Sequence, residues 1–390
     1  MHGPLIYDPV SPESHEDPYP VYARLRDEAP LFFIEQHNVW ALSRFADVRD
    51  ALRDWETFSS AQGVELGEYV QFFGEGSIQE LDPPRHDVIR KVLAPRFMNR
   101  RIKEYEPMVL ASATELLDDM GDSECDLGIA YTQRLPILTI FRILGIPEED
   151  MQWTIDAGLE MLRRPPGESG PSERAIELRA ELVSFLESLV AYRRAGNLSD
   201  DVLSDIAVGI DAGLMTESEI QGLALLLIAA GMETTTSLMG TISHLVATNE
   251  VSPDQILTDS GRLASSAIDE FLRFDAPAQW LARVTTRDLS MHGINLPAGS
   301  RVMTIFASAN RDPREFDRAD ELVFDRDGVK SLAFGAGIHF CLGMPLARLE
   351  ARVGMTALLQ RHPNMSLAGQ PTRYPSHVIR GFENIPVNLQ

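Results

Sequence analysis

The stretch FGAGIHFCLG, residues 334–343, decides how the rest of this sequence is interpreted. It places Cys341, one of only two cysteines in 390 residues, in a glycine-rich loop directly before a long helical pattern. Glycine lets the backbone approach a neighbouring group closely, and the free N–H groups at the start of a helix favour a thiolate. This position therefore indicates a cysteine with a chemical role.

The rest of the sequence limits that role. A nucleophilic thiolate needs a nearby base, and a structural zinc ion needs three more cysteine or histidine ligands. Cys125 is the only other thiol, and the spacings of zinc sites are absent. The pattern favours a thiolate that is the sole protein ligand of an iron in a planar macrocycle.

The composition is that of a globular protein large enough to bury a sizeable core. The formal net charge of −23 argues against nucleic acid as a partner, and two cysteines exclude a disulfide framework. Residues 1–20 are acidic and proline-rich, unlike a signal peptide. The longest apolar run, residues 222–232, is shorter than the roughly 20 residues of a membrane-spanning helix. We expect a cytoplasmic protein without a membrane segment.

Most of the chain has a helical pattern. The longest helix is expected over residues 216–246, opening with a capping box of Thr216 and Glu219, and another over 171–194. Residues 163–173 could be a domain boundary, but the flanking helices lack a complete core, which favours a mobile loop or lid. Short strand patterns occur at 38–43, 283–291 and 300–307. We predict a mainly α fold with small β-sheets in one domain, 1–390.

The predicted long helix contains an unusual segment. Its middle is apolar on all sides, which indicates burial, but it continues with Gly231, Glu233 and three threonines, Thr234–Thr236. One interpretation is a helix that emerges at the surface, with threonines bonded back to carbonyls. The other is a kink at which an acid and a hydroxyl face a cavity and transfer protons.

Several motifs resemble those of the cytochromes P450. FGAGIHFCLG resembles the haem-binding signature of that family, and AGMET (230–234) resembles its oxygen-activating helix segment. EFLR (270–273), DPPRHDVIR (82–90) and ANRDPREFDRADEL (309–322) resemble further P450 motifs in the same order. The resemblance covers essentially the whole chain and implies the triangular, mainly helical P450 fold, with haem b between two long helices.

The resemblance also implies roles for single residues. Cys341 matches the thiolate ligand of the haem iron. Glu270 and Arg273, whose spacing alone indicates a surface ion pair, match a pair that holds the protein near the haem. His86 and Arg90, otherwise a solvated basic helix face, match donors to a haem propionate. The complete set of expected cofactor-binding residues is His86, Arg90, Ala230, Arg283, Phe334, Gly335, His339, Cys341 and Gly343.

Glu233 and Thr234 match the acid–alcohol pair with which P450s deliver protons during the activation of O2. Fatty-acid peroxygenase relatives have arginine and proline there, so the resemblance favours a monooxygenase that uses electrons from NAD(P)H. The other class considered is a haem protein that binds a ligand without converting it, such as a sensor or carrier. The intact Glu233–Thr234 pair argues against that class.

Electrons must arrive from other proteins, because no flavin or iron–sulfur sequence is attached. We expect a ferredoxin or flavodoxin with its reductase, and a monomeric P450. Basic residues near the cysteine suggest a docking face for an acidic partner, with a solvated helix face as the alternative. They are Arg96, Arg100, Arg101, Lys103, Arg348 and Arg352.

The sequence gives a weaker indication of the substrate. Segments such as NVWALSRFADV (38–48) and IRGFENIPV (379–387) resemble the P450 branch that demethylates methoxybenzoates and methoxyphenols. Residues 64–81 contain four glutamates and no basic residue, which disfavours an anionic substrate. We expect a small neutral aromatic ether or phenol, with a terpenoid or other secondary metabolite as the alternative. Expected substrate contacts are Phe72, Ile78, Leu226, Ala229, Ala278, Leu281 and Phe382.

Overall fold

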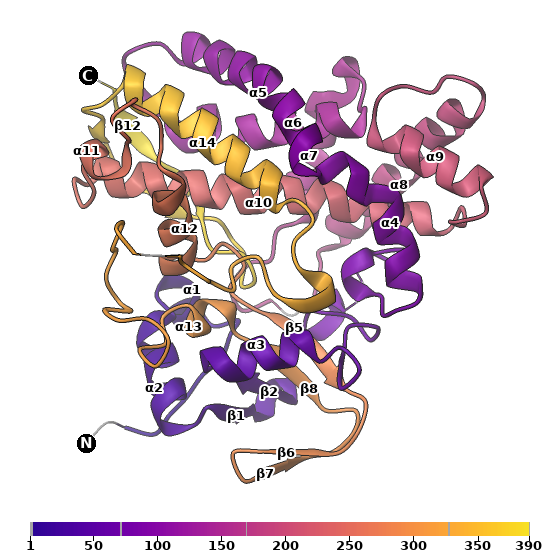
Figure 1. The fold of residues 1–390 in the computed structure, drawn as a ribbon, viewed down its shortest axis with the longest axis vertical. Helices are drawn as coiled ribbons and strands as arrows, with labels where there is room; N and C mark the ends of the chain where they lie inside the picture. The colour runs from indigo at the N-terminus through magenta and orange to yellow at the C-terminus, as the bar shows by residue number, and fades with distance from the viewer. Residues whose placement is uncertain (1–2, 71, 169, 327, 390) are drawn as a thin grey trace.

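The computed structural model describes residues 3–70, 72–168, 170–326 and 328–389, so six residues of the predicted domain lie outside the described part. In Figure 1 helices fill the upper part of the molecule and the largest sheet lies toward its lower end. The helices are α1 (Pro12–Glu16), α2 (Tyr19–Glu28), α3 (Phe45–Arg53), α4 (Arg85–Phe97), α5 (Asn99–Met120), α6 (Arg134–Leu144), α7 (Met151–Met161), α8 (Glu173–Arg194), α9 (Val202–Asp211), α10 (Glu219–Ala247), α11 (Pro253–Ile256), α12 (Ser265–Phe274), α13 (Phe306–Ala309) and α14 (Met344–Arg361).

The sheets are small, as the sequence predicts. The largest has the strand order β1-β2-β8-β5-β3, in which only β2 and β8 run parallel, with Trp40 opposite Val302. The three predicted strand segments correspond to β2, β5 with β6, and β8. The strands are β1 (Leu31–Ile34), β2 (Val39–Leu42), β3 (Phe58–Ser59), β4 (Glu124–Asp126), β5 (Leu281–Thr285), β6 (Leu289–Met291), β7 (Ile294–Leu296), β8 (Arg301–Thr304), β9 (Ser366–Leu367), β10 (Thr372–Arg373), β11 (Phe382–Asn384) and β12 (Pro386–Asn388).

Helix α10 is the centre of the hydrophobic core. It packs against α6, α8 and α14, and most of its side chains are buried. It is long and apolar enough to cross a membrane, but 72% of its most apolar stretch is buried inside the protein, as in the core helix of a folded domain. Helix α14 lies along α10 in the upper half of Figure 1. The prediction of a long buried helix is confirmed.

The predicted capping box of α10 is half formed. The Thr216 N–H donates to Glu219 Oε2 at 2.8 Å, but the Thr216 hydroxyl lies 3.0 Å from the Ser218 hydroxyl. The helix begins at Glu219 rather than at the predicted cap. The Glu219 carboxylate also pairs with Arg85 at the start of α4, so the capping acid ties α10 to α4.

The unusual segment of α10 is helical throughout, so the glycine does not interrupt the helix. A Cβ added to Gly231 would lie 2.6 Å from Ile140 Cγ1 on α6. The glycine is therefore needed for the close approach of two core helices. Its helix propensity is poor, but the packing of α6 against α10 offsets that cost.

Residues 162–172 connect α7 to α8, and both helices belong to the same hydrophobic core. The predicted loop between two helices is confirmed. Helices α7 and α8 also pack on each other, and the single domain over 1–390 stays a prediction.

The Glu270–Arg273 pair is buried, contrary to what its helical spacing alone suggests. Arg273 Nε and Nη2 donate to the two carboxylate oxygens of Glu270 at 2.8 and 2.7 Å, and neither side chain is accessible to solvent. The guanidinium also donates to the carbonyls of Asn310, Ala319 and Glu321. The same spacing at Glu160 and Arg163 gives an exposed contact of 4.0 Å. The surrounding chain, not the spacing, creates the buried pair.

Removal of one member of this pair should destabilise the fold strongly. Glu270→Gln leaves the Arg273 charge buried without its counterion, and we expect the free energy of unfolding to fall by about 3–5 kcal/mol. Glu177→Gln is the matched control, because Glu177 pairs with Arg174 at the same spacing but both are more than half exposed. The control should change stability by less than about 1 kcal/mol. Equal effects in urea unfolding would contradict a structural role of the buried pair.

Candidate active site

A cavity of about 320 Å³ lies between α10, the start of α4, strand β5 and the loop that precedes α14. Its lining is mainly apolar and includes Leu226, Ala229 and Leu281. Charged side chains reach it from α4, β5, α10 and α14 and from two loops. All nine residues predicted to bind the cofactor line this one cavity, together with Glu233 and Thr234.

The loop 334–343 presents Cys341 to the cavity. Gly335 and Gly337 have positive φ angles of 68° and 70°, and a Cβ on Gly337 would lie 2.3 Å from the Leu52 carbonyl oxygen. The Cys341 N–H donates to the Phe334 carbonyl at 2.9 Å, which closes the loop. Burial raises the pKa of the Cys341 thiol, and hydrogen bonds from the N–H groups of Gly343 and Met344 oppose this shift. These N–H groups at the start of α14 would stabilise a thiolate.

Four nitrogen-bearing side chains meet on one wall of the cavity. His86 and His339 stack edge to face with ring centroids 4.8 Å apart, and the Nε2 atoms of both are buried without a partner among the described residues. Arg283 is buried, and burial lowers its pKa to about 10. Arg90 donates to the Phe340 carbonyl at 2.8 Å. Buried donors without acceptors are costly, so this wall suits an anionic group.

Helix α10 contributes an acid and an alcohol to the same cavity. Glu233 Oε1 is buried and has no hydrogen-bond partner among the described residues. Burial raises the pKa of Glu233 to about 7, although the charge of Arg164 lowers it. The Thr234 hydroxyl donates to the Ala230 carbonyl at 2.8 Å. Thr234 is bonded back to the helix, as in the first interpretation, but α10 continues into the core rather than emerging at the surface. Glu233 and Thr234 both line the cavity, as in the second interpretation, whose proton transfer stays a prediction.

The family model described as "Cytochrome P450" matches residues 174–372. This chain belongs to the cytochrome P450 family. It is 35% identical to "Putative cytochrome P450 123" of Mycobacterium tuberculosis, over 99% of this chain and 97% of that protein. It is 33% identical to the "Vitamin D(3) 25-hydroxylase" of Pseudonocardia autotrophica, over 99% of this chain and 97% of that protein. The P450 family comprises monooxygenases that carry haem on a cysteine thiolate, bind O2 and take electrons from a redox partner.

The structural comparison agrees. The crystal structure of CYP109E1 from Bacillus megaterium in complex with testosterone has a TM-score of 0.87 and 27% identity, with 97% of this chain and 99% of that chain covered. CYP164A2 of Mycobacterium smegmatis gives a TM-score of 0.86 and 30% identity, with 98% and 99% covered. The predicted P450 fold is confirmed. None of these comparisons specifies the O-demethylating branch, so that part of the resemblance remains a prediction.

The residues of the cavity fit haem. Arg90, the buried Arg283 and the unpartnered Nε2 atom of His339 can form a donor set for two propionate carboxylates. His86 joins this set in its imidazolium form, because its Nδ1 atom lies 2.9 Å from an Asp87 carboxylate oxygen and only that form also has a proton on Nε2. Cys341 faces the same cavity from the N-terminus of α14, and Ala230 is exposed to it from α10. A flat group held at both its anionic edge and its metal would satisfy the groups that are unsatisfied in the protein alone.

Most of the expected substrate contacts also line the cavity. Ile78, Leu226, Ala229, Ala278 and Leu281 do, whereas Phe72 and Phe382 are absent from the described lining. Phe72 packs on Phe73 with ring centroids 6.1 Å apart. Phe382 packs on His244 at 4.5 Å and lies under the Arg373 guanidinium. Both rings pack on aromatic neighbours instead of lining the cavity, although Phe73 does line it, and sequence position alone could not show this.

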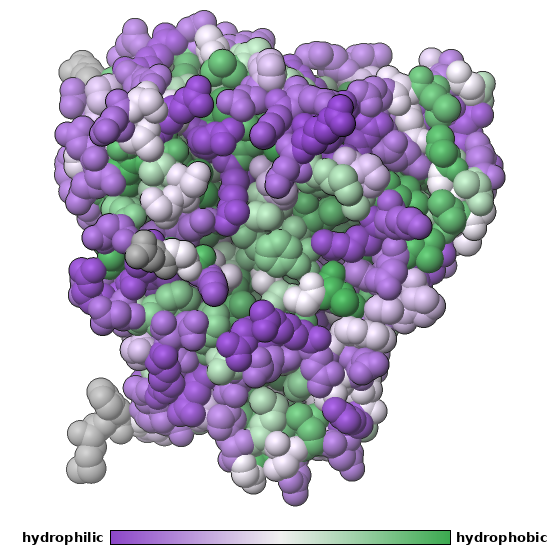
Figure 2. All heavy atoms as spheres, in the orientation of Figure 1, coloured by the Kyte–Doolittle hydropathy of each residue, from purple (hydrophilic) through white to green (hydrophobic). Residues whose placement is uncertain are grey.

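The predicted basic face is partly neutralised. Arg96 pairs with Asp200 and Asp205, and Arg101 pairs with Asp200 and Glu104. Arg348 pairs with Asp269, and Arg352 with Glu106. Arg100 and Lys103 are exposed, and neither forms an ion pair within the described residues. Figure 2, in the orientation of Figure 1, shows hydrophobic side chains near the centre of the visible side of the molecule, with hydrophilic ones around them.

Two features of the cavity were missed by sequence reasoning. Glu350 on α14 lines it, and burial raises its pKa well above the usual range, with Thr235 as a hydrogen-bonding neighbour. Arg164 enters it from the loop after α7 and pairs with Glu65. A glutamate on an otherwise apolar helix face could have indicated the first, but no local pattern indicates the second.

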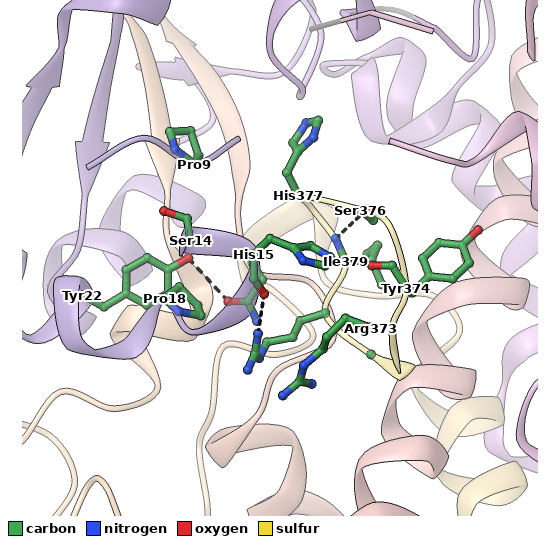
Figure 3. Close-up of a pocket in the computed structure, with 13 residues that line it drawn as sticks. Pro9, Ser14, His15, Pro18, Tyr22, Arg373, Tyr374, Ser376, His377 and Ile379 are labelled. Carbon is green, nitrogen blue, oxygen red and sulfur yellow. Dashed lines mark hydrogen bonds between the residues drawn. The ribbon is translucent and has the colours of Figure 1, made fainter. Parts of the chain in front are cut away.

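A second, smaller cavity lies beside the C-terminal segment (Figure 3). Its volume is about 20 Å³, which is room for about one water molecule. Ser14, His15, Tyr22 and Arg373 line it, and His15 Nε2 lies 2.8 Å from the Tyr374 carbonyl oxygen. This cavity is too small for a substrate.

The raised pKa of Glu233 should appear in the pH dependence of stability. An acid whose pKa rises from 4.5 to about 7 on folding contributes stability that is complete below pH 4.5 and is lost as the pH rises through 7. Glu233→Gln lacks this loss. Its stability relative to wild type should rise by up to about 3 kcal/mol between pH 4.5 and 8. Urea unfolding at both pH values measures this, with Glu177→Gln as the exposed control. If the stabilities of wild type and Glu233→Gln changed in parallel with pH, the pKa of Glu233 would be near its ordinary value.

Proposed function

We propose that Cys341 is the thiolate ligand of a haem iron and that this protein is a monooxygenase. The observation that supports this most strongly is the meeting, in one cavity, of a helix-start cysteine, four propionate donors and an acid–alcohol pair. Haem bound here would supply the insertion of one atom of O2 into a substrate bond. His86, Arg90, Arg283 and His339 would hold the propionates and fix the orientation of the cofactor.

Glu233 and Thr234 handle protons in this proposal. A carboxyl group with a pKa of about 7 is partly protonated near neutral pH, so Glu233 can both take up and release a proton at Oε1. Thr234 follows it on the same helix and offers a hydroxyl to the cavity. The pair supports turnover and argues against the alternative of a non-catalytic haem sensor or carrier.

The proposed substrate is small, neutral and mainly apolar, because the lining around Leu226, Ala229 and Leu281 is apolar. Hydroxylation or O-demethylation of an aromatic ether or phenol is the first candidate. A terpenoid or other secondary metabolite is the second, and the relatives favour it. One similar protein is named a vitamin D3 hydroxylase, and one similar structure contains testosterone.

Electrons are proposed to come from NAD(P)H through a ferredoxin or flavodoxin and its reductase, in the cytoplasm. Arg100 and Lys103 are the unpaired charges of the predicted docking face, so they are the residues available to an acidic partner. Arg96, Arg101, Arg348 and Arg352 already have acidic partners within this chain. Arg100 and Lys103 are therefore expected to contribute most to docking.

The thiolate assignment is tested by Cys341→Ser. The reduced protein with carbon monoxide should lose the absorption spectrum of a thiolate-bound haem, because a serine oxygen does not donate electron density as a thiolate does. Cys125→Ser is the matched control, since Cys125 lies on β4 outside the cavity lining, and it should keep the spectrum. A thiolate spectrum in Cys341→Ser would exclude this ligand.

The proton role is tested by Thr234→Ala. The variant should fold and bind haem but release more hydrogen peroxide per NADH consumed, because the cavity loses a positioned hydroxyl. Thr236→Ala is the matched control. Thr236 makes the same bond to the carbonyl four residues back, at 2.6 Å, without lining the cavity. Glu233→Gln should slow NADH consumption itself. If Thr234→Ala and wild type released the same amount of peroxide per NADH at saturating substrate, Thr234 would have no role beyond its place in the helix.

A further inference from the structure

The substrate cavity contains one buried ion pair that is not explained by cofactor binding. Arg164 Nε and Nη2 donate to the two carboxylate oxygens of Glu65 at 3.0 and 2.9 Å. The two side chains are only 3% and 7% exposed, and both line the cavity. They come from different loops, residues 60–70 before α4 and residues 162–172 between α7 and α8.

Within the described residues, the pair keeps hydrogen-bonding capacity that no other group uses. Arginine has five N–H donors, and three hydrogen bonds account for three of them, the third from Nη1 to the Leu162 carbonyl at 2.7 Å. Each Glu65 oxygen accepts one bond from Arg164 and retains a lone pair. The Tyr69 ring, 4.9 Å from the guanidinium carbon, covers one side of it. The remaining capacity can serve a ligand in the cavity.

Stability alone does not account for the pair. Two buried charges lose much of their hydration, and an apolar pair of similar size is often equally stable. The neighbouring pair Arg163–Glu383 already ties the same loop to the C-terminal segment at 2.8 Å, is 40% and 32% exposed, and does not line the cavity. The pair Glu65–Arg164 thus differs from its neighbour by facing the substrate space.

The pair also changes the interpretation of the acidic segment 64–81. Arg164 neutralises Glu65, so the polar end of the cavity has no net charge at this pair. Glu233 is an ionisable neighbour of the pair that also lines the cavity, and its charge raises the cost of placing an anion nearby. A neutral group that both donates and accepts a hydrogen bond fits this end best. An alcohol or phenol hydroxyl is such a group.

We propose that the Glu65–Arg164 pair anchors a hydroxyl group of the substrate and so selects substrates with an apolar body and one such oxygen. The hydroxyl donates to a Glu65 oxygen and accepts from an Arg164 N–H, while the apolar lining around Leu226 and Ala229 holds the body. The proposal rests on the monooxygenase function proposed above. It makes Glu65 and Arg164 specificity-determining residues.

The test compares matched ligands on the haem-loaded protein through the substrate-induced spin-state shift. The pairs are 4-butylphenol with butylbenzene, and 5α-androstan-3β-ol with 5α-androstane. Of the two ligand pairs, the one whose size fits the cavity is decisive. For that pair, the alcohol-to-hydrocarbon affinity ratio of wild type should exceed that of Glu65→Leu/Arg164→Met by about ten-fold or more. The matched control Arg163→Met/Glu383→Leu should keep the wild-type ratio.

Each outcome decides the proposal. The proposal would be overturned if Glu65→Leu/Arg164→Met kept the wild-type alcohol-to-hydrocarbon affinity ratio, or if it lost affinity for alcohol and hydrocarbon equally. Either result would show that the pair only shapes the cavity. The absence of a shift with either alcohol would also overturn the anchor. If the apolar variant does not load haem, the same alcohol-to-hydrocarbon affinity ratio is measured on Glu65→Gln/Arg164→Gln. Failure of the monooxygenase assignment is recognised separately, by a wild-type carbon monoxide spectrum without a thiolate signature.

Discussion

The buried Glu270–Arg273 pair is the interaction on which the placement of the cysteine loop depends. Arg273 binds the carbonyl of Asn310, and the Asn310 side chain accepts a hydrogen bond from the Leu332 N–H at 2.6 Å. The Leu332 carbonyl in turn accepts from the Gly335 N–H. This chain of bonds leads from α12 to the loop that holds Cys341. The fold thus fixes the thiol by satisfying buried polar groups in sequence.

The second constraint is the separation of charge within one apolar cavity. Arg90, Arg283 and His339, which form no ion pair within the described residues, lie on the wall formed by α4, β5 and the cysteine loop. Acids lie on α10, on α14 at Glu350, and in the loop where Glu65 pairs with Arg164. Burial and the positive charge of Arg283 lower the pKa of His339 to about 2, while burial raises the pKa of Glu233 to about 7. The carboxylates of an anionic cofactor would accept hydrogen bonds from the nitrogen-bearing side chains. A proton on Glu233 removes the cost of burying its negative charge. The same apolar lining therefore favours an anion beside α4 and β5 and a protonated carboxyl group on α10.

Sequence reasoning predicted the parts that depend on local pattern. The long apolar helix and the glycine-rich cysteine loop could be predicted from local pattern, whereas the residues that converge on the cavity were expected only from the resemblance to the P450 family. It failed where a partner comes from a distant segment. Arg96 and Arg101 share Asp200, about a hundred positions away, and Glu65 meets Arg164 across a similar separation. Such pairs are determined by tertiary packing, which local sequence does not encode.

The geometry of Thr234 is compatible with the proton role proposed for it, although its hydroxyl is bonded back to the helix. Its only hydroxyl proton is donated to the Ala230 carbonyl, so the oxygen lone pairs are what it presents to the cavity. Thr236 and Ser237 make the same bond to carbonyls four residues back, whereas Thr241 and Ser243 on the same helix bond to side chains of other segments. Thr234 differs in facing an open space, so its hydroxyl can rotate toward a ligand at the cost of one internal bond, about 1 kcal/mol. A neighbouring acid with a pKa of about 7 can replace a donated proton. The helix thus holds Thr234 as an acceptor at rest and leaves it able to become a donor when a partner arrives.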